Sequence, residues 1–172
     1  IHIFSGTLLD DVALGLPVQA GDWPDERVRE AVLDALARVG ADWVDDLPEG
    51  LDTVMGRLGT RLSPARAQQV ALARALLADP PIIILDEATA EAGSSGAAVL
   101  DRAATEVVTG RTALVVAHRL SQVAMADEVA VMDGGRIVEV GSPEQLRCGD
   151  GRFAQLWQML SLIHISEPTR PR

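Results

Sequence analysis

A short apolar run that ends in two acids is the strongest indication of the fold. Residues 82–87 read Ile-Ile-Ile-Leu-Asp-Glu, and two prolines precede them. The length of the run and its β-branched residues predict a strand that is buried on both faces, as in a parallel sheet. Ligands of such sheets bind beyond the carboxyl ends of the strands. Asp86 and Glu87 are therefore candidate site residues, unless one of them merely caps the following turn.

Helical and strand patterns alternate around this run, which predicts an α/β domain with a terminal hairpin. Helices are indicated by apolar residues at helical spacing, and strands by runs of β-branched residues. The sequence Asp133-Gly134-Gly135 between two such runs indicates a hairpin turn. Residues 1–24 and 48–61 carry several Gly and Pro and are expected to be irregular. The expected helices and strands, in chain order, are residues 25–39, 64–78, 82–85, 96–108, 113–117, 129–132 and 136–140.

Composition narrows the chemistry and the partners. Hydrophobic residues make up 48% of the 172 positions, enough for a packed core, and the formal charge of −10 argues against nucleic acid or anionic lipid. All 15 basic residues are arginine, so this chain contains no P-loop lysine of the GxxxxGK[ST] pattern. The single Cys148 excludes an internal disulfide and fits a reducing compartment. No apolar run reaches the roughly 20 residues of a membrane span.

Two further positions are candidates for contact with an anion. Ser63 is a plausible N-cap of the helix over 64–78, with Pro64 at its first position, and free amides at a helix N-terminus attract anions. The simpler reading is an ordinary N-cap. His118 follows the second buried strand, where it could reach a phosphate, although a single histidine in such a place is more often structural.

Taken together and in order, these motifs resemble the ABC ATPase family, and within it the exporter-type nucleotide-binding domains. Residues 62–63 stand where the family's LSGGQ signature begins, residues 82–87 resemble its Walker B strand, and His118 its H-loop. The resemblance implies a truncated P-loop NTPase fold, with a helical signature subdomain and the C-terminal part of a mainly parallel sheet. Four further segments agree with it: residues 4–8, 47–53, 135–141 and 144–146.

The resemblance assigns a role to each candidate residue. Asp86 would hold Mg²⁺ through water, Glu87 would orient or deprotonate the attacking water, and His118 would contact a phosphate of ATP. In the family, two such domains sandwich ATP between the Walker motifs of one and the signature of the other. The signature residues that would face the partner's nucleotide are Leu62, Ser63 and Arg66.

Two departures from the family pattern bear on that role. The signature reads Leu-Ser-Pro-Ala-Arg at residues 62–66, so both glycines are gone and Pro64 has no N–H to offer a phosphate. The D-loop at residues 90–93 reads Ala-Glu-Ala-Gly, where the family has SALD. One hypothesis is a heterodimer with one impaired site. The alternative is a homodimer in which Arg66 and Gln68 partly replace the lost contacts.

The resemblance covers residues 1–159, and we expect the P-loop and the Q-loop glutamine to lie upstream of them. Residues 160–172 resemble a translated sequencing adapter, with a natural polar tail as the alternative. On its own the chain is expected to be inactive and marginally stable, since its sheet would keep an uncovered edge.

For the complete protein we expect an exporter ATPase at the cytoplasmic face of the plasma membrane, with a fused or associated transmembrane domain and no nucleic-acid partner. A soluble ABC-type ATPase and a regulatory module that hydrolyses nothing are the alternatives. An acidic chain without heptads disfavours the first, and the presence of Glu87 disfavours the second.

Overall fold

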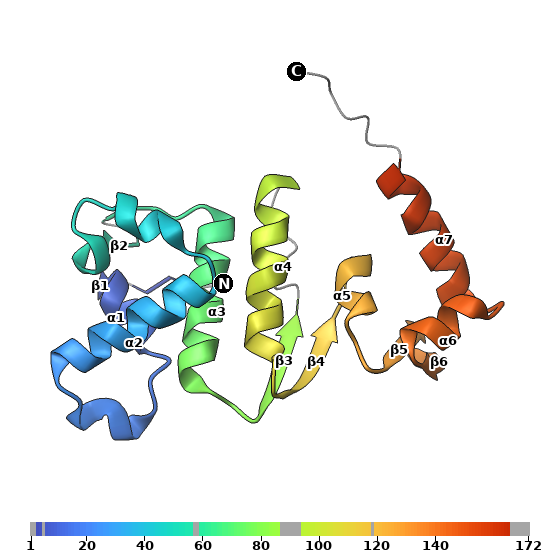
Figure 1. The fold of residues 1–172 in the computed structure, drawn as a ribbon, viewed down its shortest axis with the longest axis horizontal. Coiled ribbons are helices and arrows are strands. Elements are labelled where there is room, and N and C mark those ends of the chain that lie inside the picture. Colours follow the sequence, from blue (N-terminus) through green and yellow to red (C-terminus); the bar gives the residue numbers. More distant parts are fainter. Residues whose placement is uncertain (1–2, 5, 57–58, 87–93, 118, 166–172) are drawn as a thin grey trace, which may run out of the picture. The chain divides into compact units, whose positions relative to one another are not determined.

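The computed structural model describes residues 3–4, 6–56, 59–86, 94–117 and 119–165. The chain divides into two compact units, Ile1–Val116 and Ala117–Arg172. Unit 1 holds the helices α1 to α4 and the parallel strands β3 and β4, and unit 2 holds a hairpin and three helices (Figure 1). The prediction of an α/β domain is confirmed.

Unit 1 begins with a strand and helix that a capping box joins. In β1 (Gly6–Thr7) and α1 (Leu8–Ala13), Thr7 Oγ accepts a hydrogen bond from Asp10 N, and Asp10 Oδ2 accepts from Thr7 N at 3.0 Å and Thr7 Oγ at 2.8 Å. The bonds from the Thr7 backbone and side chain hold the pKa of Asp10 below its usual value. The expectation that all of residues 1–24 are irregular was therefore wrong, because one Thr and one Asp suffice to start a turn of helix.

The predicted helix over 25–39 is confirmed as α2 (Asp25–Arg38), after a short 3₁₀ turn η1 (Val18–Asp22). Its buried residues Val32 and Leu36 lie one turn apart and enter the core. Gly40, the expected stop, has a φ of +67°, a left-handed conformation that glycine adopts without steric cost.

Between α2 and α3 the chain is mostly irregular, as expected for residues 48–61. It contains two 3₁₀ turns, η2 (Asp42–Asp46) and η3 (Gly50–Asp52), and the strand β2 (Val54–Met55), which pairs antiparallel with β1.

The segment around η3 fastens α2 and α1 together. Asp52 accepts a hydrogen bond from Arg29 Nη2 at 2.5 Å, and this bond raises the pKa of Arg29. The carbonyl oxygen of the buried Thr53 accepts from Leu8 N at 3.0 Å. Residues 47–53, part of the family resemblance, therefore have a structural role in this subdomain.

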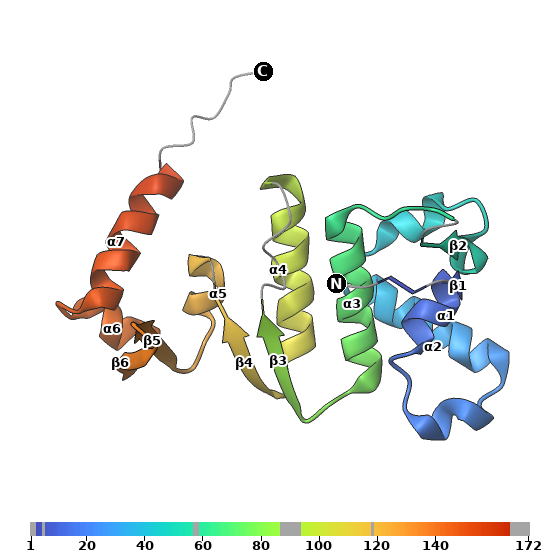
Figure 2. The ribbon, with the colours of Figure 1, turned by 180° about the vertical axis from the view of Figure 1, so that it is seen from behind.

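Helix α3 (Pro64–Ala78) matches its predicted range and lies beside α2 and α4 (Figures 1 and 2). An ion pair joins it to α1: Arg74 Nη1 lies 3.0 Å from Oδ1 of Asp11, whose side chain is 1% exposed. Gly15 approaches the same turn so closely that a Cβ would lie 2.3 Å from the Arg74 carbonyl oxygen.

The predicted strands form a parallel pair, β3 (Ile82–Asp86) and β4 (Thr112–Val116), connected through α4 (Ser94–Val108). Ile83 and Leu85 pack in the core with α3 and α4, but Ile82 and Ile84 are 66% and 65% exposed. The prediction of burial on both faces was wrong for the described residues, because helices cover one face of this pair.

In unit 2, the predicted hairpin is confirmed as β5 (Val129–Asp133) and β6 (Arg136–Gly141). Gly134 and Gly135 have φ of +52° and +76°, as a tight two-residue turn between twisted strands requires.

Three helices flank the hairpin in the chain: α5 (Leu120–Ala124), α6 (Pro143–Cys148) and α7 (Arg152–Ile165). Arg152 Nη1 bonds to Asp133 Oδ2 at 2.8 Å and so ties α7 to the hairpin. Because α7 continues to Ile165, no helix end marks the boundary expected between residues 159 and 160. The adapter origin of the tail stays a prediction.

Candidate functional site

The N-terminus of α3 is capped by Ser63, as predicted. Ser63 has extended backbone angles, and its Oγ accepts a hydrogen bond from Arg66 N at 3.3 Å. Pro64 occupies the first helical position, where its fixed φ suits the helix. The prediction that Ser63 is the N-cap is confirmed, and Leu62 is half-buried beside the core.

This cap leaves few backbone donors for an anion. Pro64 has no N–H, and the N–H of Arg66 already bonds to Ser63 Oγ. The amide of Ala65 remains as the first-turn donor that helix geometry does not use. A phosphate at this end of α3 would therefore depend on side chains more than on the backbone.

The Arg66 side chain lies against an aromatic ring from a different segment. Its guanidinium carbon is 5.1 Å from the centroid of the Trp43 ring, within the range of a cation–π contact. Trp43 belongs to η2 and is 8% exposed. The contact joins the start of α3 to the segment that follows α2.

Gln69 fixes the same tryptophan from one turn further along α3. Its Oε1 accepts a hydrogen bond from Trp43 Nε1 at 2.9 Å, and its Nε2 donates to the carbonyl oxygens of Val39 and Gly40 at 3.1 and 2.6 Å. Sequence reasoning missed both Trp43 and Gln69. The available signal was a glutamine at a helix position next to the buried Val70, where an apolar side chain is usual.

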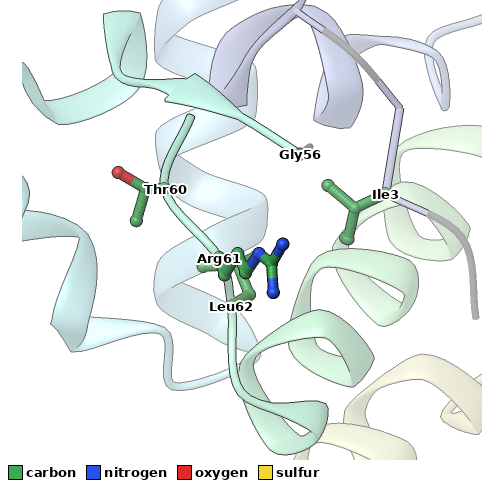
Figure 3. A pocket seen from close by; sticks show the side chains of 5 residues that line it. All are labelled: Ile3, Gly56, Thr60, Arg61 and Leu62. Atoms are coloured by element: carbon green, nitrogen blue, oxygen red, sulfur yellow. The ribbon is translucent and has the colours of Figure 1, made fainter. Parts of the chain in front are cut away.

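A shallow pocket of about 290 Å³ lies in front of α3 (Figure 3). Arg61 and Leu62, from the segment that leads into α3, line one side of it, and Ile3 lies across from them. Gly56 and Thr60 complete the lining. Its volume falls just below the range typical of small-molecule sites, and we assign no ligand to it.

Asp86 is the last residue of β3, and its side chain is exposed. Its register partner is Val116, the last residue of β4, so both strands end at the same edge of the pair. Glu87 and His118, the predicted catalytic residues, lie outside the described residues, and their roles stay predictions.

An exposed carboxylate at a strand end fits the expected Mg²⁺ site. Mg²⁺ keeps several waters and is usually held by one or two carboxylates and by substrate phosphates. Among the described residues, no group of three or more His, Cys, Asp or Glu side chains is placed to hold a metal ion.

The N-terminus of α3 and the carboxyl ends of β3 and β4 face the same side of unit 1 (Figures 1 and 2). No hydrogen bond or ion pair between described residues joins Asp86 to Ser63 or Arg66. The described candidates therefore lie on the same side of the unit but form no single cluster.

None of the helices within the described ranges has both the length and the apolar character that a membrane crossing requires.

Comparison with known proteins bears on these features. The family model described as "ABC transporter" matches residues 14–90, a range that includes the start of α3 and the end of β3. The ATP-dependent lipid A-core flippases of Vibrio cholerae, Alkalilimnicola ehrlichii and Hahella chejuensis are 39%, 41% and 43% identical to the chain over 156, 158 and 159 residues. These similarities cover 91%, 91% and 92% of the chain, but 26% of each relative. The chain thus spans about a quarter of the length of these relatives.

Proposed function

Since the chain belongs to the ABC transporter family, as part of an exporter-type nucleotide-binding domain, we propose that it serves ATP-driven export across a membrane. The observation that carries this proposal is an identity of 39–43% with ATP-dependent flippases over more than nine-tenths of the chain. The part that matches is the nucleotide-binding part, so the proposal names no cargo. A soluble ABC-type ATPase receives no support from these relatives.

In this proposal the hydrolytic residues follow the carboxyl ends of β3 and β4. Asp86 would hold Mg²⁺ through water, and a bound Mg²⁺ would supply positive charge to offset that of the phosphates. Glu87 orients or deprotonates the attacking water, and His118 contacts a phosphate. The exposed carboxylate at the last position of β3 supports the first of these roles.

The N-terminus of α3 acts on a second nucleotide-binding domain. Leu62, Ser63 and Arg66 face the nucleotide that the partner domain holds, and the half-site with Pro64 is the weaker one. A heterodimer explains this asymmetry, and a homodimer with a drifted signature is the alternative. Single-turnover hydrolysis by the full-length protein without a partner separates the two, since a heterodimer subunit alone would not reach the rate of the pair.

The complete protein works at the cytoplasmic face of the plasma membrane, joined to a transmembrane domain. The membrane flippases among the relatives support this location. The 172-residue chain by itself is expected to hydrolyse no ATP, because it contains no P-loop lysine to contact the β- and γ-phosphates.

Steady-state ATPase measurements on the full-length protein test the proposal. Glu87→Gln is expected to lower kcat by about 100-fold or more, the usual contribution of a general base. The exposed Glu144, in the first turn of α6, provides the matched control, because Glu144→Gln makes the same change of charge in a different element of the chain. Equal turnover of wild type and Glu87→Gln would refute the assignment and favour the regulatory alternative.

A further inference from the structure

We propose that Trp43 and Gln69 are positioning residues that hold the guanidinium of Arg66 for contact with a nucleotide phosphate. The inference rests on the function proposed above and specifies how the altered signature segment meets its ligand. The inference depends on three observations: Gln69 holds the Trp43 ring in place, the Arg66 guanidinium lies against that ring, and Arg66 has no ion-pair partner among the described residues that would compete with a phosphate.

The indole of Trp43 has one hydrogen bond and almost no freedom. Gln69 receives the indole N–H at 2.9 Å, and the amide of the same glutamine is anchored by two backbone carbonyls at 3.1 and 2.6 Å. Both side chains are buried, at 8% and 5% exposure. A buried side-chain network whose donors and acceptors are satisfied holds a single geometry.

Arg66 and Gln69 are three residues apart on α3 and therefore lie on the same face of the helix. The ring that Gln69 fixes is the ring on which the Arg66 guanidinium rests, at 5.1 Å from its centroid. Stacking on an aromatic face restricts a long side chain without using its N–H groups. Trp43 and Gln69 together therefore form a platform that sets the orientation of Arg66, and the stacking leaves the N–H groups of Arg66 free to donate hydrogen bonds.

Arg66 has no carboxylate partner among the described residues. Four other arginines of unit 1, Arg29, Arg38, Arg74 and Arg111, form ion pairs with Asp or Glu. In the part of the chain that the structure describes, Arg66 forms none, although the chain carries 25 acidic residues. Its charge and its planar set of donors thus stay available to an anion.

A guanidinium suits the deficit that Pro64 creates. The substituted signature has lost a backbone donor at the first helical position, and only Ala65 offers a free first-turn amide. A guanidinium can bond to two oxygens of a phosphate at once, with charge assistance that a neutral amide lacks. Arg66, held in the first turn of α3, supplies this contact from its side chain.

The test is a double-mutant cycle on the full-length protein, with MgATP as the probe and KM, kcat and the thermal midpoint as readouts. Arg66→Ala is expected to raise KM about tenfold, the usual loss of a charged hydrogen bond, and Arg66→Lys to recover part of it. Trp43→Leu is expected to raise KM about fivefold in the wild-type background and less than 1.5-fold in the Arg66→Ala background. Gln69→Leu should behave like Trp43→Leu.

The second arginine–tryptophan stack of unit 1 provides the control. Arg27 lies 3.9 Å from the centroid of the Trp23 ring, so Trp23→Leu removes the same kind of contact elsewhere and should leave KM unchanged. If Trp43→Leu fails to fold, Gln69→Leu completes the same cycle with Arg66→Ala, because Arg66 is half-buried and its truncation leaves the core intact.

Three results would overturn the inference while the wild type still turns over ATP. The first is an unchanged KM in Arg66→Ala, and the second is a rise in KM in the double variant that equals the combined rises of Arg66→Ala and Trp43→Leu. The third is a lowered thermal midpoint of Trp43→Leu or Gln69→Leu with KM unchanged, which would mean that the stack is structural only. A full-length wild type that hydrolyses no ATP would instead defeat the proposed function itself.

Discussion

The ion pair between Asp11 and Arg74 gives the sharpest prediction about stability. Asp11 is 1% exposed, the Arg74 side chain 16%, and their atoms lie 3.0 Å apart. Removing one partner of a buried pair costs about 3–5 kcal/mol, because the other charge stays in a medium of low polarity. Arg74 also lies 5.5 Å from the Phe4 ring centroid, a contact worth about 0.5–1 kcal/mol.

Arg74→Met keeps most of the side-chain volume and is expected to lower the free energy of unfolding by about 3–4 kcal/mol. Replacing both partners, as Asp11→Leu with Arg74→Met, should recover most of this loss, because no charge is then left buried. The measurement is urea unfolding of the complete nucleotide-binding domain, followed by circular dichroism at pH 7, because the 172-residue chain by itself is expected to be only marginally stable.

The control is the exposed pair of Arg38 and Glu106, whose atoms lie 2.7 Å apart with side chains 45% and 40% exposed. Arg38→Met is expected to cost at most about 1 kcal/mol, and less at high salt. The reasoning fails if Arg74→Met costs no more than Arg38→Met, or if the losses of the two single variants at the Asp11–Arg74 pair add in the double variant.

Three further predictions concern two glycines with constrained surroundings or backbone angles and the helix-capping Asp10. Gly15→Ala would place a Cβ 2.3 Å from a backbone oxygen of α3 and should cost about 1–3 kcal/mol in urea unfolding, whereas Gly21→Ala, with nothing within 4 Å, should be nearly neutral. Because the pKa of Asp10 is lowered in the folded state, its contribution is present above the unfolded pKa and disappears as the pH falls through the folded pKa. Asp10→Ala should remove a few tenths of a kcal/mol at pH 7 and flatten the acid limb of the stability profile, with the exposure of the carboxylate keeping the effect small. Gly135→Ala, at a φ of +76°, should lower the thermal midpoint by an amount equivalent to about 1 kcal/mol.

Several elements could be predicted because their causes are local. A serine cap with a following proline starts α3, and the positive φ of Gly40 ends α2, so the ranges of both helices follow from the sequence. The Asp-Gly-Gly turn likewise fixes the hairpin of β5 and β6. α1 was missed because two hydrogen bonds of a capping box stabilise a helix too short to show a period.

The residues of the candidate site that belong to sequence motifs could be predicted. The start of α3 and the acid at the end of β3 lie where the sequence indicated. The platform of Trp43 and Gln69 escaped detection, because their contact joins segments 26 residues apart through side chains that no periodicity relates.

The family, the order of the elements and the identity of the acids and the serine could be read from the sequence, since each depends on residue types at short spacing. Which faces are buried and which charges are paired became known from the folded chain. Ile82 and Ile83 are chemically alike, yet one is 66% exposed and the other 7%, because a helix lies on one side of their strand. Arg66 and Arg74 lie on the same helix, yet the guanidinium of Arg66 lies against the Trp43 ring, whereas that of Arg74 forms an ion pair with the buried Asp11. Burial and pairing depend on neighbours that are distant in the chain, and so appear only when the chain is folded.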